Sequence, residues 1–330
     1  LMKPICNRVH VSVPATSANL GSGFDTVGLA LDYHDELVFT LNEDPSDGVA
    51  HVIIHGEGED TLPRDETHLV VSTFRRACAT FGLGNLGFTL EATNNIPQAR
   101  GMGSSAEAIV AGIAAAAAFA QDGELNRAAI FDMAAHFEGH PDNVAPAVFG
   151  GLTVSWDFEM PEGVGSVPVP GGEPLHGGFH TVNYPVDPAV TAAVFVPDYE
   201  LSTEKAREAL PKEIAYRDAI YNVSRVGLLP AAMNPVDGVE PNALMYVATQ
   251  DKLHQQYRAP LMQPSTDLIA LFRSHGYAAA VSGAGPCVLV LHYGDARDAI
   301  DQVAAEQLAS GHWNVLHLPI NTKGVEVERS

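Results

Sequence analysis

A bare turn of glycines and serines leads directly into the most apolar stretch of the chain, and this junction constrains the fold more than any other feature. Residues 97–112 read PQARGMGSSAEAIVAG. The apolar run from Ala108 to Ala120 is shorter than the roughly 20 residues that span a bilayer, so it predicts a buried helix. Glycines let a backbone approach a ligand closely, and the free N–H groups of a helix N-terminus attract anions. The turn is therefore a candidate phosphate site, although a helix start capped by serine has the same residues.

The turn does not match the two common nucleotide-binding loops. A Walker A loop needs a lysine after its second glycine, and the sequence has no lysine between Lys3 and Lys205. Gly101, Gly103 and Ala106 fit the looser G-x-G-x-x-A spacing. The polar residues before them do not predict the strand that a dinucleotide-binding fold requires at this place.

Composition and charge limit the classes of partner. The chain has 330 residues, of which 46% are hydrophobic and 18% charged, and this predicts an ordered globular protein with room for two domains. Eighteen basic and 40 acidic residues give a net charge of -22, and such a field repels nucleic acids and anionic membranes. A site for a polyanionic nucleotide must therefore be locally positive, through a helix end, a few arginines and a divalent cation.

The cysteines indicate a reducing compartment. Cys6, Cys78 and Cys287 are odd in number and far apart, which favours neither a disulfide framework nor a structural zinc site. The first residues, LMKPICNRVHVSVPA, lack the apolar core of a signal peptide. We therefore expect a cytoplasmic protein.

Patterning predicts an α+β chain in two parts. Residues 161–178 contain ten glycines and prolines and cannot form a helix interior or a central strand, so we expect the domain junction there. Before it, we expect strands and helices in mixed order: strands at 9–13, 35–41, 50–55, 86–92 and 151–156, and helices at 67–81, 104–121 and 126–138. The first strand is expected to give way to a loop at Pro14. Beyond the junction, the expected order βαββαβ predicts a ferredoxin-like domain that includes strands at 191–197 and 313–319 and a helix at 296–309.

Four motifs in order resemble those of the GHMP kinase superfamily, and within it the homoserine kinase family. They are PATSANLGSGFDTVGLAL (14–31), ARGMGSSAEAIVAGIAAA (99–116), FEGHPDNVAPAVFGGL (137–152) and VSGAGPCVLVL (281–291). The resemblance implies a ribosomal-protein-S5-like ATP-binding domain over 1–175 and a ferredoxin-like domain over 176–330, with ATP and an alcohol acceptor between them. It implies transfer of the γ-phosphate of ATP to L-homoserine, giving O-phospho-L-homoserine for threonine biosynthesis. A homodimer is one possible assembly.

The resemblance also implies residues for the nucleotide and the metal. His68 replaces the family's asparagine near the adenine, and the turn at 282–286 is expected behind the reacting groups. Ser105 and Glu138 are expected to hold Mg²⁺, with Asp132 as the alternative carboxylate. Glu107 is expected to face away from the phosphates. The full set of expected ATP-binding residues is His68, Pro97, Gln98, Ala99, Arg100, Gly101, Met102, Gly103, Ser104 and Ser105.

An amino-acid acceptor asks for guanidinium groups opposite its carboxylate and for a carboxylate or amide opposite its ammonium. By the resemblance, Thr203, Arg207 and Arg258 contact the substrate, while Asn19 and Asp25 bind its ammonium and hydroxyl ends. Arg207 is expected to take part in catalysis with Asp25 and Glu138. Asp25 could accept the proton of the hydroxyl or only orient it, because phosphoryl transfer needs mainly alignment and charge neutralisation.

His140 is also expected at the acceptor. A zinc pair of His136 with His140 is disfavoured, because Gly139 and Pro141 would end the helix between the two imidazoles.

Two other functions stay open at this point. A sister kinase that acts on a mevalonate-pathway alcohol would have no use for Arg207 and Arg258. A non-catalytic nucleotide sensor on the same fold would keep the glycine-rich loop without needing Glu138.

Overall fold

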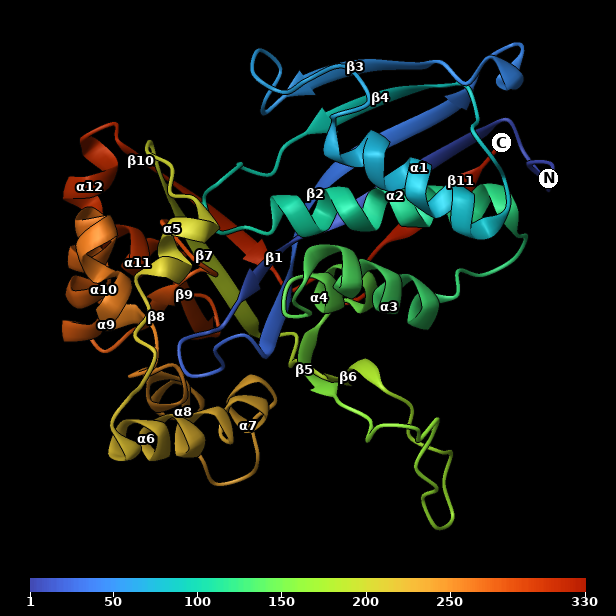
Figure 1. Ribbon diagram of the computed structural model, residues 1–330. Coiled ribbons are helices and arrows are strands. Elements are labelled where there is room, and N and C mark those ends of the chain that lie inside the picture. The colour runs from blue at the N-terminus through green and yellow to red at the C-terminus, as the bar shows by residue number, and fades with distance from the viewer.

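The strands form two sheets in a computed structural model that describes all residues, 1–330 (Figure 1). The seven-stranded sheet has the order β11-β1-β2-β4-β3, and β5 extends it from β2 and β6 from β5. Its strands are β1 (Arg8–Ala18), β2 (Val27–Leu41), β3 (Ala50–Gly56), β4 (Phe88–Asn94), β5 (Leu152–Phe158), β6 (Gly178–Tyr184) and β11 (Glu326–Arg329).

The second sheet confirms the predicted ferredoxin-like order. Its strands are β7 (Val190–Pro197), β8 (Ala278–Val281), β9 (Val288–Tyr293) and β10 (Trp313–Pro319). They lie in the order β10-β7-β9-β8, with every neighbouring pair antiparallel. This is the arrangement expected when two βαβ units interlock in one sheet.

The helices cover these sheets in separate groups. Figure 1 shows α1 (Leu69–Phe81), α2 (Ser104–Ala120), α3 (Arg127–Glu138) and α4 (Val144–Phe149) packed together over the seven-stranded sheet. The other helices are α5 (Thr203–Glu208), α6 (Tyr216–Val226), α7 (Leu229–Met233), α8 (Pro241–Ala248), α9 (Gln255–Arg258), α10 (Gln263–Ser274), α11 (Arg297–Val303) and α12 (Ala305–Ala309), with short 3-10 helices at Pro45–Asp47 and Ala259–Met262. No helix has both the length and the apolar composition needed to cross a bilayer.

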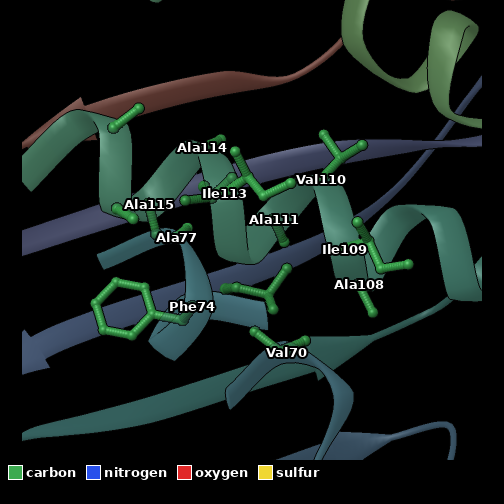
Figure 2. Close-up of a cluster of buried hydrophobic side chains, with 14 of the residues drawn as sticks. Val70, Phe74, Ala77, Ala108, Ile109, Val110, Ala111, Ile113, Ala114 and Ala115 are labelled. Carbon is green, nitrogen blue, oxygen red and sulfur yellow. The ribbon is translucent and has the colours of Figure 1, made fainter. Parts of the chain in front are cut away.

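Helix α2 is the buried helix that the sequence predicts. Alanine is the strongest helix former, and all residues of α2 after its first two are buried. Figure 2 shows its side chains against Val70 and Phe74 of α1. The two helices approach so closely that a Cβ on Gly112 would lie 2.9 Å from the backbone nitrogen of Phe74. Small side chains thus fix α2, and with it the turn at its start.

A shared core joins the two parts of the molecule. It contains Leu29 of β2, Val194 of β7 and Leu289 of β9, together with residues of α7 and α8. The opposite face of the four-stranded sheet packs on α10, through residues such as Phe195 and Phe272. Because apolar burial is the main stabilising term in folding, this shared core fixes the relative position of the loops that extend from both sheets.

Several predicted boundaries differ from the structure. Strand β1 does not end at Pro14 but continues to Ala18, since a bulge between Pro14 and Ala15 accommodates the missing N–H. The predicted helix at 296–309 is two helices that meet at Ala304.

The predicted junction at 175/176 does not separate the two sheets. The strand just beyond it, β6, pairs with β5 of the first sheet, and the last strand, β11, returns to pair with β1. The Gly- and Pro-rich residues 161–177 form the long connection between β5 and β6, which extends away from the rest of the molecule in Figure 1. The change from one sheet to the other falls between Tyr184 and Val190.

Candidate active site

A cavity of about 240 Å³ lies where the start of α2 meets loops from both parts of the chain. The loop after β1, the end of α3, α5, α9 and the turn between β8 and β9 all contribute to its walls. It brings together most of the predicted site residues: Asn19, Asp25, Ala99, Gly101, Gly103, Ser104, Ser105, Glu138, His140, Thr203, Arg207 and Arg258. Segments that are distant in sequence therefore form one site.

Backbone geometry builds the side of this cavity that the glycine-rich loop before α2 forms. Gly101 and Gly103 have φ values of 91° and 76°, in the left-handed region that favours glycine. A Cβ on Gly101 would lie 2.1 Å from the carbonyl oxygen of Ser282, and one on Gly103 would lie 2.0 Å from Oγ1 of Thr16. These positions therefore leave no space for a side chain.

The start of α2 leaves its first N–H groups free. The N-cap is Gly103, and no side chain caps the helix, so the alternative of a serine-capped start is wrong. The N–H of Glu107 donates to the carbonyl of Gly103, and the N–H groups of the residues before it have no intrahelical acceptor. Together with the partial positive charge of a helix N-terminus, these groups can bind an anion in a strongly acidic protein.

Three of the expected ATP-binding residues line neither this cavity nor the one beside it. Arg100 directs its Nε to the carbonyl oxygen of Tyr199, at 3.1 Å. Met102 is buried in the core that joins the two parts of the chain. Pro97 is buried as well. The loop therefore faces the cavities mainly through glycines, Ala99 and serines.

A second cavity, of about 360 Å³, adjoins the first along the start of α2. His68 and Gln98 line it with Glu107, and both cavities share Ala99, Ser104, Ser105 and Thr203. Nδ1 of His68 accepts a hydrogen bond from the N–H of Val70 at 3.2 Å, while its buried Nε2 has no partner. Burial lowers the pKa of His68, so the neutral ring carries its proton on Nε2 and has a free donor.

Glu107 lines the second cavity and not the first. Its side chain is buried, and its charge interacts with that of Asp35. Burial, followed by the charge of Asp35, raises the pKa of Glu107 well above its usual 4.5. Burial also raises the pKa of Asp35, but hydrogen bonds from the backbone N–H groups of Ile96 and Asn95 oppose this rise, so of the two carboxyl groups Glu107 is the one that keeps its proton.

Glu138 and Ser105 meet where the start of α2 lies beside the end of α3. Oγ of Ser105 donates to Oε2 of Glu138 at 2.9 Å, and both residues line the first cavity. Burial raises the pKa of Glu138, and the charge of His140 and the bond from Ser105 oppose that rise. Asp132, the alternative carboxylate, lies outside the cavity, and its Oδ1 is 3.5 Å from Nδ1 of His136.

His140 belongs to a chain of hydrogen-bonding groups at the end of α3. Its Nδ1 lies 2.6 Å from Oδ1 of Asp142, and its Nε2 lies 3.5 Å from Oε1 of Glu138. The bond to Asp142 raises the pKa of His140. His136 instead packs edge-on against Phe179 outside the cavity. The two histidines therefore do not form a pair.

Asp25 and Arg207 form an ion pair between the loop after β1 and helix α5. Nη1 and Nη2 of Arg207 donate to the two carboxylate oxygens of Asp25 at 2.8 and 3.0 Å, and this bond raises the pKa of Arg207. The N–H of Asp25 donates to Oδ1 of Asn19, whose Nδ2 in turn donates to the carbonyl of Gly283. Asn19 therefore braces the loop that presents Asp25.

Arg258 is a buried guanidinium without a carboxylate partner. It is only 2% exposed, and it donates from Nε to the carbonyl of Ala206 at 3.0 Å. Its Nη1 lies 3.3 Å from Nδ1 of His254, and its guanidinium lies over the ring of Phe24. Burial lowers the pKa of Arg258, and no ion pair offsets the cost of burying its charge. A buried charge without a partner is costly, and Arg258 is among the residues that line the cavity.

Sequence reasoning missed several residues of the site. Asp142 and Asn143 line the cavity, and Oδ1 of Asn143 accepts a hydrogen bond from the hydroxyl of Thr16 at 2.9 Å. Asp142 and Asn143 follow His140 in the third motif, which was the available signal. Thr16 lies within the first motif and His254 within none of the four, but nothing in the sequence indicated their contacts, because these come from segments far away in the chain.

Comparisons with known proteins agree on one family. The profile of the GHMP kinases N terminal domain matches residues 68–151, and that of the GHMP kinases C terminal domain matches residues 236–309. Homoserine kinase of Clavibacter michiganensis subsp. michiganensis is 41% identical over 97% of this chain and 94% of its own. Homoserine kinase of Leifsonia xyli subsp. xyli is 42% identical over 97% and 92%.

Solved structures share the fold. The crystal structure of homoserine kinase from Cytophaga hutchinsonii aligns with a TM-score of 0.79 at 25% identity, over 99% of both chains. A mevalonate kinase aligns with a TM-score of 0.63 over 95% of this chain and 99% of its own, but at 10% identity. The second likeness concerns the fold alone, because function depends on the residues of the site.

Proposed function

This chain belongs to the homoserine kinase family of the GHMP kinases, and on that premise we propose how its two adjoining cavities hold ATP and the acceptor. The reaction is the transfer of the γ-phosphate of ATP to the hydroxyl of homoserine. The observation that carries the proposal is Arg258, a buried guanidinium that lines the cavity and lacks a carboxylate. An acceptor that brings its own carboxylate supplies the missing partner.

The nucleotide is proposed to lie along the start of α2. Its phosphates accept hydrogen bonds from the free N–H groups that follow Gly103, while its base enters the second cavity, beside His68. The glycines of the loop allow the backbone to contact phosphate oxygens directly. This arrangement meets the requirement for local positive potential with few positively charged side chains.

Homoserine is proposed to lie between Arg258 and Asp25. Its carboxylate pairs with Arg258, and its hydroxyl donates to the carboxylate of Asp25, which Arg207 holds in a fixed orientation through two hydrogen bonds. His140 and Thr203 complete the walls around the acceptor. Holding the hydroxyl in line with the γ-phosphate would account for much of the rate acceleration, because phosphoryl transfer depends mainly on the alignment of the reacting groups.

Ser105 and Glu138 fit a bound Mg²⁺. Hydroxyl and carboxylate oxygens suit this ion, which normally keeps phosphate and water ligands as well. No group of three or more His, Cys, Asp or Glu side chains could hold a metal ion here, so the protein would share the ion with the nucleotide. When bound, Mg²⁺ would neutralise charge on the phosphates.

A panel of acceptors tests this proposal. Phosphorylation is measured by coupling ADP formation to a detectable reaction, with homoserine, serine, threonine, mevalonate, 4-hydroxybutanoate and 3-aminopropan-1-ol. We expect homoserine to have the highest kcat/KM. We expect 4-hydroxybutanoate, which keeps the carboxylate, to exceed 3-aminopropan-1-ol, which lacks it, by about tenfold or more. Equal use of these two analogues, or turnover of mevalonate without homoserine, would overturn the proposed binding mode.

A further inference from the structure

His254 is a buried residue that lines neither cavity and yet contacts both sides of the proposed acceptor site. Its side chain is completely buried. Its Nε2 lies 2.8 Å from the carbonyl oxygen of Gly21, and its Nδ1 lies 3.3 Å from Nη1 of Arg258. Its ring stacks on Phe24, with centroids 4.9 Å apart. One imidazole therefore bridges the loop after β1 and helix α9.

The two partners define the protonation state of this ring. A carbonyl oxygen can only accept, so Nε2 carries a hydrogen and donates to Gly21. A guanidinium can only donate, so Nδ1 presents its lone pair to Arg258. Burial lowers the pKa of His254, against the opposing charges of Asp251 and Asp25, which keeps the ring neutral. Both ring nitrogens are then satisfied, as a buried polar side chain requires.

The backbone of His254 is fixed as firmly as its ring. Oδ2 of Asp251 accepts hydrogen bonds from the N–H groups of His254 and Gln255 at 3.0 and 2.8 Å. Oδ1 of Asp251 accepts from the side chain of Asn222 at 2.8 Å. Because the side chain of Asp251 is itself buried, the imidazole has a defined position from which to orient its two partners.

The two partners of His254, Arg258 and Gly21, belong to opposite ends of the proposed acceptor site. Arg258 is the proposed anchor of the carboxylate. Gly21 belongs to the loop that carries Asn19 and Asp25, which have φ values of 76° and 58°. Such conformations are strained in residues other than glycine and persist only where their surroundings hold them. The bond from His254 to Gly21 is one of these constraints.

We propose that His254 is a positioning residue that sets the spacing between the carboxylate anchor Arg258 and the hydroxyl-binding Asp25, and thereby selects an acceptor of homoserine's length. The inference rests on the proposed role of Arg258. Serine is one methylene shorter than homoserine, so a fixed spacing between the two ends disfavours it. A looser spacing would reduce that discrimination.

Two amide substitutions separate the two bonds of His254. The side-chain amide of asparagine reaches the position of Nδ1, and that of glutamine reaches the position of Nε2. His254→Asn therefore keeps an acceptor for Arg258 and loses the donor to Gly21. His254→Gln keeps the donor to Gly21 and loses the acceptor for Arg258. Each variant tests one end of the bridge.

Kinetic constants for both substrates provide the readout. We expect His254→Gln to raise the KM for homoserine about tenfold, while the KM for ATP stays within about twofold, since α2 is untouched. We expect His254→Asn to lower kcat more than it raises the KM for homoserine, because the loop of Asp25 is loosened. In both variants the ratio of kcat/KM for homoserine over serine should fall.

This ratio does not depend on how much of a variant is folded, so it remains informative if stability decreases. An unchanged ratio in both variants would overturn the inference and leave His254 a purely structural residue. Arg258→Lys, measured in parallel, distinguishes failure of the anchor role of Arg258 from failure of the positioning role of His254. An unaltered KM for homoserine in Arg258→Lys would refute the anchor role on which the inference rests, whereas an altered KM there with normal His254 variants would refute the inference alone.

Discussion

The two sides of the cleft differ in the groups that they present to a ligand: backbone N–H groups on one side and charged side chains on the other. On the proposed nucleotide side, Gly101 and Gly103 shape a loop that is continuous in sequence, and the first N–H groups of α2 are free to bind an anion. On the acceptor side, Asp25, Arg207 and Arg258 bring charged side chains from three separate segments. Backbone groups suit a ligand that always has the same phosphates, whereas side chains fit one particular acceptor. The comparison predicts that substitutions on the nucleotide side impair binding by displacing the backbone, whereas substitutions on the acceptor side impair it by removing a charged contact.

The largest effect is expected where the two sides meet, at Glu138. Glu138→Gln removes a negative charge but keeps the shape of the side chain, so we expect kcat to fall by about a hundredfold or more. The Mg²⁺ concentration needed for half-maximal activity should rise. Asp132→Asn is the matched control, because Asp132 lies on the same helix outside the cavity. Equal losses in the two variants would contradict the assignment of the metal to Glu138.

A steric test addresses the nucleotide side. In Gly101→Ala the new Cβ would lie 2.1 Å from the Ser282 carbonyl, so the loop must move. We expect affinity for a non-hydrolysable ATP analogue, measured by calorimetry, to fall by about tenfold to a hundredfold.

Gly294→Ala provides the control for backbone strain. Gly294 has a φ of 89°, and a Cβ there would meet nothing within 4 Å. It should cost about 1–2 kcal/mol of stability without weakening nucleotide binding. Similar nucleotide affinities in the two variants would show that the backbone of the loop is not tightly constrained.

A charge-preserving substitution addresses the acceptor side. Arg258→Lys keeps a positive charge but loses the planar fork that can hold a carboxylate through two hydrogen bonds. We expect the KM for homoserine to rise about tenfold, with little change in the KM for ATP. Because 3-aminopropan-1-ol has no carboxylate, its kcat/KM should be nearly the same in variant and wild type. A similar loss with this analogue would indicate general damage to the site.

The smallest effect is expected beneath the nucleotide side, at the buried pair of Glu107 and Asp35. The unfolded chain releases the Glu107 proton above its usual pKa of 4.5, whereas the folded chain retains it to higher pH. Stability from this group is therefore complete below about 4.5 and is lost as the pH rises. Glu107→Gln removes this pH dependence. The free energy of unfolding of the variant, relative to that of the wild type, should therefore increase from pH 5 to pH 8 by on the order of 1 kcal/mol.

Denaturant unfolding at both pH values measures this gain. Glu43→Gln, at an exposed position, is expected to change stability little at either pH. A gain of Glu107→Gln that is the same at pH 5 and pH 8 would argue against a retained proton.

Helix α2 and the turn before it were largely predictable from the sequence. The alanine run predicted a buried helix, and the glycines before it predicted a turn without side chains. Both features depend only on residues that are neighbours in the sequence. The sequence of strands and helices in the second part of the chain was predictable for the same reason, since apolar periodicity marks each strand and helix locally. Pro14 misled the prediction, because local propensity does not reveal a bulge that keeps a proline within a strand.

The acceptor side depended on the tertiary structure. The motifs indicated which residues belong there, but not that Arg207 binds Asp25 across 182 residues of sequence, nor that His254 reaches Gly21 across 233. Nor did they indicate that β6 and β11 would join the first sheet. Local sequence determined the helix, the bare turn and the order of strands, since short-range sterics and periodicity govern these. Only tertiary packing decided which charged groups meet, because those contacts form when a shared core brings distant segments together.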